Sequence, residues 1–164
     1  MTRVPPRLRS YEPRFAATIV AWARSADELD AWASPTERRP DVFDRWHAEP
    51  GVHPFVLAVE DEPVAYGEVW EDHEEDEAEL ARVIVAPSMR GRGLGRTLIT
   101  MLAAEARRMG FVDIWVRVVP SNAAALACYG AAGFERTDAD EEAAFNAGQP
   151  RVYVWMRLPP DPLG

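Results

Sequence analysis

The chain has 164 residues, which suits one domain large enough to bury its own apolar core. Its 27 acidic and 18 basic residues give a formal net charge of −9, which argues against a nucleic-acid or anionic-membrane surface. No apolar run approaches the ~20 residues of a membrane span. A single cysteine, Cys128, excludes an internal disulfide framework. We therefore expect a cytoplasmic protein without a nucleic-acid or membrane partner.

Apolar periodicity predicts helices and strands in alternation along the chain. The first third is predicted to hold a strand at 7–11, a helix at 14–23, a second helix capped by Ser25 and Glu28, and a loop with one helical turn over 34–51. The remainder is predicted to hold strands at 55–59, 64–70, 78–86, 111–119 and 152–156, a short strand start at 133–134, helices at 96–109 and 122–132, a solvated acidic loop at 71–77 and a polar connection at 138–150. Helices on a mixed, mainly antiparallel sheet make an α+β (mixed α/β) fold.

Two groups of aromatic residues leave their role open. The aromatic residues Phe43 and Trp46 either line the mouth of a substrate site or close the core. The tryptophans near the ends of the chain, if exposed, favour a homodimer.

A glycine- and arginine-rich loop lies between a buried strand and a helix. Val83–Ala86 is an apolar run closed by Pro87, and helical spacing begins near Arg96. The loop between them contains Arg90, Gly91, Arg92, Gly93, Leu94 and Gly95. Glycine permits close backbone approach to a ligand, and a helix N-terminus offers free N–H groups to an anion. The pattern therefore predicts an anion site.

The spacing of this loop selects among anion-binding motifs. It lacks the Gly-Lys-Ser/Thr ending of a P-loop, and position 96 is Arg where a dinucleotide fingerprint needs glycine. Arg90-x-x-Gly93-x-Gly95 after an apolar strand resembles the acetyl-coenzyme A signature of the GNAT (Gcn5-related) N-acetyltransferase family. A second segment agrees: Asn122 opens a helix, Tyr129 lies near its end, and Gly133-Phe134 leads out of it, as is common in that family.

The resemblance implies a GNAT fold, a twisted sheet of six to seven strands whose central strands splay apart. It implies one N-acetyltransferase domain over 1–164, with the motif-bearing core at about 53–157 and an N-terminal part, 1–52, that shapes the acceptor site. Acetyl-CoA would be the co-substrate and a small-molecule or peptide amine the acceptor, with no metal and with a possible homodimer.

The resemblance also implies roles for individual residues. The strand backbone would bind the pantetheine arm, and the Val85 N–H would polarise the thioester carbonyl. Tyr129 would act near the coenzyme A sulfur as a general acid or a hydrogen-bond donor, whereas Asn122 caps its helix whether or not it contacts the cofactor. The cofactor-binding candidates are Val83, Ile84, Val85, Arg90, Gly91, Arg92, Gly93, Leu94, Gly95, Arg96, Asn122 and Tyr129.

An amine attacks only when it is neutral, so a carboxylate is the expected general base. Glu79 is the first candidate and Glu68 the second; either is alternatively a solvated residue at a strand edge. The acidic run at 71–77 is either a solvated loop or a feature that attracts a cationic acceptor. The sequence thus predicts an acetyl-CoA-dependent N-acetyltransferase that works through a ternary complex. The alternatives are an acyl-CoA-binding sensor without turnover and a transferase that uses another acyl-CoA.

Overall fold

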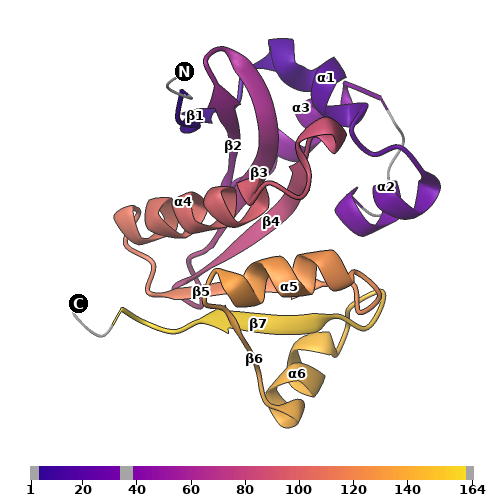
Figure 1. Ribbon diagram of the computed structural model, residues 1–164. Helices are drawn as coiled ribbons and strands as arrows, with labels where there is room; N and C mark the ends of the chain where they lie inside the picture. The colour runs from indigo at the N-terminus through magenta and orange to yellow at the C-terminus, as the bar shows by residue number, and fades with distance from the viewer. Residues whose placement is uncertain (1–3, 34–38, 162–164) are drawn as a thin grey trace.

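The computed structural model describes residues 4–33 and 39–161, which build one twisted sheet with helices on both faces (Figure 1). The strand order is β1-β2-β3-β4-β5-β7-β6, and every neighbouring pair is antiparallel except β4 and β5. The strands are β1 (Arg7–Ser10), β2 (Val52–Val59), β3 (Glu62–Asp72), β4 (Glu77–Val85), β5 (Asp113–Val118), β6 (Glu135–Arg136) and β7 (Val154–Leu158). The predicted fold class and the predicted strand number are confirmed.

The helices separate onto the two faces of the sheet. The 3₁₀ turn η1 (Pro13–Phe15) and the helices α1 (Ala16–Val20), α2 (Ala26–Ala33) and α3 (Val42–His47) cover one face. Helices α4 (Leu94–Arg108) and α5 (Ala123–Ala131) cover the other face, side by side in Figure 1. A second 3₁₀ turn, η2 (Pro87–Met89), follows β4, and α6 (Ala139–Asn146) precedes β7. Residues 34–38 of the predicted loop at 34–51 lie outside the described residues.

Strand alternation builds a separate core on each face. Along β2, Phe55 and Leu57 face α4, whereas Val56 faces the N-terminal helices. Phe43 and Trp46 of α3 are 1% and 7% exposed in the second core, so of their two open roles they close the core. The first third of the chain therefore packs on one face of the sheet.

Two sequence-based expectations about the C-terminal part were wrong. The segment 138–150 contains α6, whose first turn is capped by Asp138 accepting a hydrogen bond from the Glu141 N–H at 2.9 Å. The final strand begins at Val154 rather than at residue 152, because the Tyr153 N–H and C=O both bond to the Asn146 side chain at 2.9 Å.

Two expectations about the first third also need correction. Ser25 Oγ accepts from the Glu28 N–H at 3.1 Å as predicted, but the Glu28 carboxylate accepts from the Arg24 N–H instead of completing the capping box. Five of the six tryptophans are at most 8% exposed, so exposed tryptophans do not support a homodimer. No helix in the described ranges is long and apolar enough to cross a membrane.

Close packing of α4 on β3 depends on Gly67. A Cβ at Gly67 would lie 2.7 Å from Leu102 Cδ1 and 3.3 Å from Val83 Cγ2. Gly67→Ala should therefore lower the free energy of unfolding by about 1–3 kcal/mol through overpacking. The matched change Gly130→Ala adds a Cβ in open space on α5 and should raise the free energy of unfolding by about 0.5–1 kcal/mol. Urea unfolding measures both, and equal effects would contradict this account of the packing.

Candidate functional site

Strands β4 and β5 pair only over the first three residues of β4. Their parallel register covers Glu77↔Asp113, Ala78↔Ile114 and Glu79↔Trp115, and within the described residues the two strands do not pair beyond that point. The strands separate there, as the splay implied by the family resemblance requires. Along the facing edges the two strands consequently do not satisfy each other's backbone groups.

A β-bulge in β4 accompanies the separation. In the β3–β4 ladder Tyr66 faces Ile84 and Glu68 faces Ala81, so Arg82 and Val83 both lie opposite Gly67. Arg82 has φ +49°, a backbone conformation that costs a non-glycine residue roughly 1–3 kcal/mol. The Arg82 C=O accepts a hydrogen bond from Trp32 Nε1 at 2.7 Å, which ties the bulge to α2.

A buried carboxylate holds the Arg82 side chain. Glu68 is fully buried and accepts from Arg82 Nη1 at 2.9 Å, from Trp70 Nε1 at 2.6 Å and from the Tyr66 hydroxyl. The Arg82 guanidinium also stacks on the rings of Trp46 and Trp70, at 4.1 and 4.8 Å from their centroids. Glu68 lines neither of the two cavities found beside the splay. Its placement makes it a structural group, and the expectation that it serves as a base is not supported.

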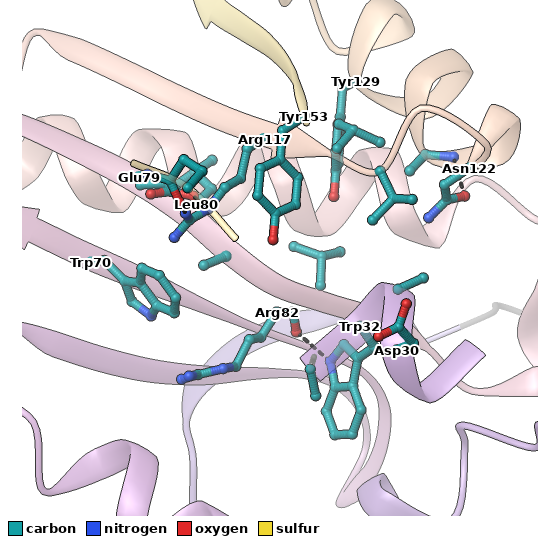
Figure 2. Close-up of a pocket in the computed structure, with 18 of the residues that line it drawn as sticks. Asp30, Trp32, Trp70, Glu79, Leu80, Arg82, Arg117, Asn122, Tyr129 and Tyr153 are labelled. Carbon is teal, nitrogen blue, oxygen red and sulfur yellow. Dashed lines mark hydrogen bonds and ion pairs between the residues drawn. The ribbon is translucent and has the colours of Figure 1, made fainter. Parts of the chain in front are cut away.

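A cavity of about 290 Å³ occupies the splay. Figure 2 shows the hydroxyl ends of Tyr129 and Tyr153 directed into it, with Trp32 on the opposite side and Glu79 beside Arg117 at one end. The cavity therefore brings together residues from α2, β4, β5, α5 and the segment before β7. Of the sequence-predicted residues, Glu79, Val83, Asn122 and Tyr129 line it.

The ladder with β3 determines which way each backbone N–H of β4 points beside this cavity. The Ala86 N–H donates to Val64 C=O at 2.9 Å, so Ala86 and Val64 form a hydrogen-bonded pair. Alternation in an antiparallel ladder then directs the N–H of Val85 away from β3 and the N–H of Ile84 toward it. The Val85 N–H thus points to the side of the splay, whereas the Ile84 backbone belongs to the sheet.

The glycine-rich loop forms the N-terminus of α4. Gly91 and Gly93 have φ of +74° and +79°, which side chains disfavour, and Gly93 is the residue before the first turn of α4. Gly95 favours close packing instead, because a Cβ there would lie 3.1 Å from Cys128 Sγ of α5 and would displace that side chain slightly. The first turn of α4 contains no acidic residue, so its free N–H groups form an uncompensated positive end.

Arg90 has a partner within the protein at each of its three side-chain nitrogens. Its Nε donates to Val85 C=O at 3.1 Å, Nη1 to Glu28 Oε1 at 2.7 Å and Nη2 to Trp22 C=O at 3.2 Å. Its guanidinium therefore ties the loop to β4 and to the N-terminal helices instead of projecting toward an anion. Arg92 and Arg96 are exposed and supply the positive charge around the loop.

Tyr129 is buried at the α5 side of the cavity. Burial raises the pKa of Tyr129 well above its usual value, and the neighbouring Cys128 and Glu79 raise it further. The hydroxyl consequently stays protonated and acts as a hydrogen-bond donor. Asn122 caps α5, since its Oδ1 accepts from the Ala125 N–H at 3.2 Å, and it also lines the cavity.

Glu79 has a guanidinium partner that the sequence analysis missed. Arg117 Nε lies 2.7 Å from Glu79 Oε1, and Arg117 Nη1 donates to Gln149 Oε1 at 3.0 Å. Burial raises the pKa of Glu79 even though Arg117 favours its ionised form. The one available signal was a charged residue between Val116 and Val118 in an otherwise apolar strand. Its partner, 38 positions away, could not be identified without the fold.

Comparisons with known proteins agree with this geometry. The model of the family described as the acetyltransferase (GNAT) family matches residues 17–134. The ribosomal protein bS18 alanine N-acetyltransferase of Salmonella typhimurium is 46% identical over 59 residues, which are 36% of this chain and 40% of that relative. The match thus spans well under half the length of that relative.

Two solved structures share the fold. An aminoglycoside acetyltransferase in complex with coenzyme A superposes with a TM-score of 0.74 at 21% identity, covering 93% of this chain and 94% of its own. Spermidine N-acetyltransferase from Vibrio cholerae, in complex with CoA and spermine, gives a TM-score of 0.70 at 20% identity, covering 93% and 92%.

The structural role of Glu68 is testable by stability. Glu68→Ala leaves the Arg82 guanidinium without its partner in a largely buried site, so the free energy of unfolding should fall by about 3–5 kcal/mol. Glu49→Ala removes an exposed carboxylate and should change it by less than about 0.5 kcal/mol. Chemical denaturation of both variants provides the comparison. A Glu68→Ala protein as stable as the Glu49→Ala protein would rule out this role.

Proposed function

Because the chain belongs to the GNAT acetyltransferase family, we propose that it transfers an acetyl group from acetyl-CoA to a primary amine. The observation that carries the proposal is the cavity in the splay, which has Val83 of β4 on one wall and the hydroxyl of Tyr129 on another. The fold neighbours that were solved with coenzyme A are consistent with it.

The residues around the splay suit the cofactor. Backbone N–H groups at Gly93 to Arg96, with the positive end of α4, would bind the pyrophosphate, and Arg92 and Arg96 would add charge. The backbone of Val83 and Val85 would bind the pantetheine arm as an added strand. Arg90 would act indirectly, by fixing the loop through Val85 and Glu28. Acetyl-CoA supplies an acetyl thioester when bound.

The proposed transfer is a direct one within a ternary complex. Glu79, six residues before Val85 on β4, takes a proton from the substrate ammonium through a chain of waters, and the neutral nitrogen attacks the thioester carbonyl carbon. The Val85 N–H donates to the carbonyl oxygen as negative charge develops there, an interaction worth about 3–4 kcal/mol in the transition state. The new C–N bond forms, the C–S bond breaks, and the nitrogen gives its remaining extra proton to the departing sulfur or to water.

Tyr129 is proposed to stabilise the departing thiolate. Because burial raises the pKa of its phenol, complete proton transfer to a thiolate of much lower basicity is unfavourable. A hydrogen bond from the hydroxyl to sulfur needs no such transfer. The role is therefore that of a donor, the second of the two roles that the sequence analysis assigned to it.

The acceptor is proposed to be a primary amine of a cationic molecule. The relatives are named for different amines: the alanine of a ribosomal protein, aminoglycosides and spermidine. Location in the cytoplasm stays a prediction from the single cysteine. A homodimer stays a prediction from the family resemblance, because the buried tryptophans give it no support.

A coupled thiol-release assay tests the function directly. Purified protein with acetyl-CoA and a panel of amines, aminoglycosides and basic peptides should release coenzyme A in an amine-dependent manner. Tyr129→Phe should lower kcat about 10-fold or more, with little change in coenzyme A affinity, because it removes one transition-state hydrogen bond. Stabilisation by coenzyme A without turnover across the panel would favour the sensor alternative. Turnover only with a longer acyl-CoA would favour the alternative of a transferase that uses another acyl-CoA.

The pH dependence of kcat tests Glu79 as the base. A base must be ionised, so activity should fall as pH decreases through the pKa of Glu79, which burial holds above its ordinary value. Glu79→Gln should abolish that acidic limb and lower kcat about 10²-fold or more. Glu49→Gln, a change on the exposed surface, serves as the control. An unchanged acidic limb in Glu79→Gln would remove this residue from the mechanism.

A further inference from the structure

Arg117 lies where β4 and β5 begin to separate. The last pair of residues between the two strands is Glu79↔Trp115, so Arg117, two residues further along β5, is inside the splay. Its neighbours Val116 and Val118 pack in the α4 core, and by alternation Arg117 faces the other side of the sheet. Glu79 faces that side too, because its own neighbours in β4 pack in the same core. The two side chains can therefore meet across the start of the splay.

The Arg117 guanidinium is held from several directions. Its Nε lies 2.7 Å from Glu79 Oε1, and its Nη1 donates to Gln149 Oε1 at 3.0 Å. Three aromatic rings lie around it, with centroids 5.4 to 5.5 Å from the guanidinium carbon: those of Trp70, Tyr153 and Trp155. Groups from β3, β4 and the C-terminal part of the chain thus keep this cation beside the cavity, as Figure 2 shows.

Two opposing effects act on the Glu79 carboxylate. Burial raises its pKa, because a buried carboxylate loses its hydration, whereas Arg117 and, less strongly, Arg82 favour the ionised form. Arg82 is already paired with Glu68, so among the described residues Arg117 is the ion-pair partner of Glu79. The side chains of Glu79 and Arg117 are only 19% and 25% exposed, so solvent screens their attraction weakly.

The other titratable groups near Glu79 come from several elements. Tyr129 of α5, which stays protonated because burial raises its pKa, and Tyr153 before β7 line the same cavity. Asp30 of α2 lies at the other end of that cavity and has an ion pair of its own. The remaining groups are carboxylates of β3, β4 and the turn between them: Glu71, Asp72, Glu75 and Glu77. None of these groups, which are those that the described residues bring to the two cavities, can supply a cation to Glu79.

We propose that Arg117 is a positioning residue for the proposed reaction, because it holds the Glu79 carboxylate ionised and in one orientation at the start of the splay. The inference rests on the proposed function, since it takes Glu79 as the base. Without the guanidinium, burial would keep a proton on Glu79 up to a higher pH, and a protonated carboxyl cannot accept a proton from the substrate. Arg117 keeps its own protons throughout, because a guanidinium does not lose them in a protein.

The pH dependence of kcat separates this role from a purely structural one. Arg117→Gln should move the acidic limb upward by about one pH unit or more, because an opposite charge in contact lowers a carboxyl pKa by about that amount. Arg117→Lys should leave the limb within about half a unit of its wild-type position, since the charge remains. It should nevertheless lower kcat, because an ammonium cannot hold Glu79 and Gln149 through one planar group.

A matched control removes an arginine that is paired elsewhere. Arg108 forms an exposed ion pair with Glu105 on α4, so Arg108→Gln should change neither kcat nor the position of the limb. An acidic limb that stays at its wild-type position in Arg117→Gln would overturn the proposal, because a residue that only stabilises the fold predicts that result.

A measurement on the wild-type protein keeps the test valid if Arg117→Gln fails to fold. The ¹⁵Nε NMR signal of Arg117 should shift with the same midpoint as the acidic limb, because its ion-pair partner loses its charge there, and Glu79→Gln should abolish that shift. A signal that stays constant through the limb would overturn the proposal. Absence of turnover with every amine would instead overturn the proposed function, even where the Arg117 signal still follows the charge on Glu79.

Discussion

The architecture depends on one strained residue, Arg82, and on the groups that hold it. Its positive φ places an extra residue in β4, and the strand beyond Glu79 no longer pairs with β5. The cost of roughly 1–3 kcal/mol for that conformation is offset by the ion pair with Glu68, stacking on Trp46 and Trp70, and the hydrogen bond from Trp32. Groups from three elements of the N-terminal half thereby maintain an opening in the middle of the sheet.

This opening connects two faces of different chemistry. On the α4 and α5 side lies a helix N-terminus with glycines in left-handed conformations, which suits an anion. On the side of the N-terminal helices lie the Glu79–Arg117 ion pair and the carboxylates of Glu75 and Glu77. In the proposed reaction the anionic acyl donor would approach from the side of the helix N-terminus and the amine from the side of the carboxylates.

Local signals predicted most of the fold and part of the site. The apolar runs of β2 to β5 and the glycine pattern before α4 can be read from residues adjacent in the sequence, so the type of these elements was predictable. Helix α6 was missed because its residues are mainly alanine and acidic, although Asp138 with Glu141 three positions on is a capping pattern. The roles of Arg90 and Arg117 could not be predicted because their partners are far away in the sequence. The role of Glu68 depends on its burial, which the sequence does not show. No local signal marks the bulge, since position 82 is not a glycine.

The central claim is that the β4 backbone in the splay binds the acyl donor. Amide NMR of the uniformly ¹⁵N-labelled protein during a titration with coenzyme A measures this at single residues. The account predicts large, saturable shifts of the Val83 and Val85 amides together with those of Gly93 to Arg96, while the Ile84 amide, bonded within the sheet, shifts less. Saturable binding that leaves the Val85 amide unperturbed, or shifts confined to another part of the molecule, would contradict the account.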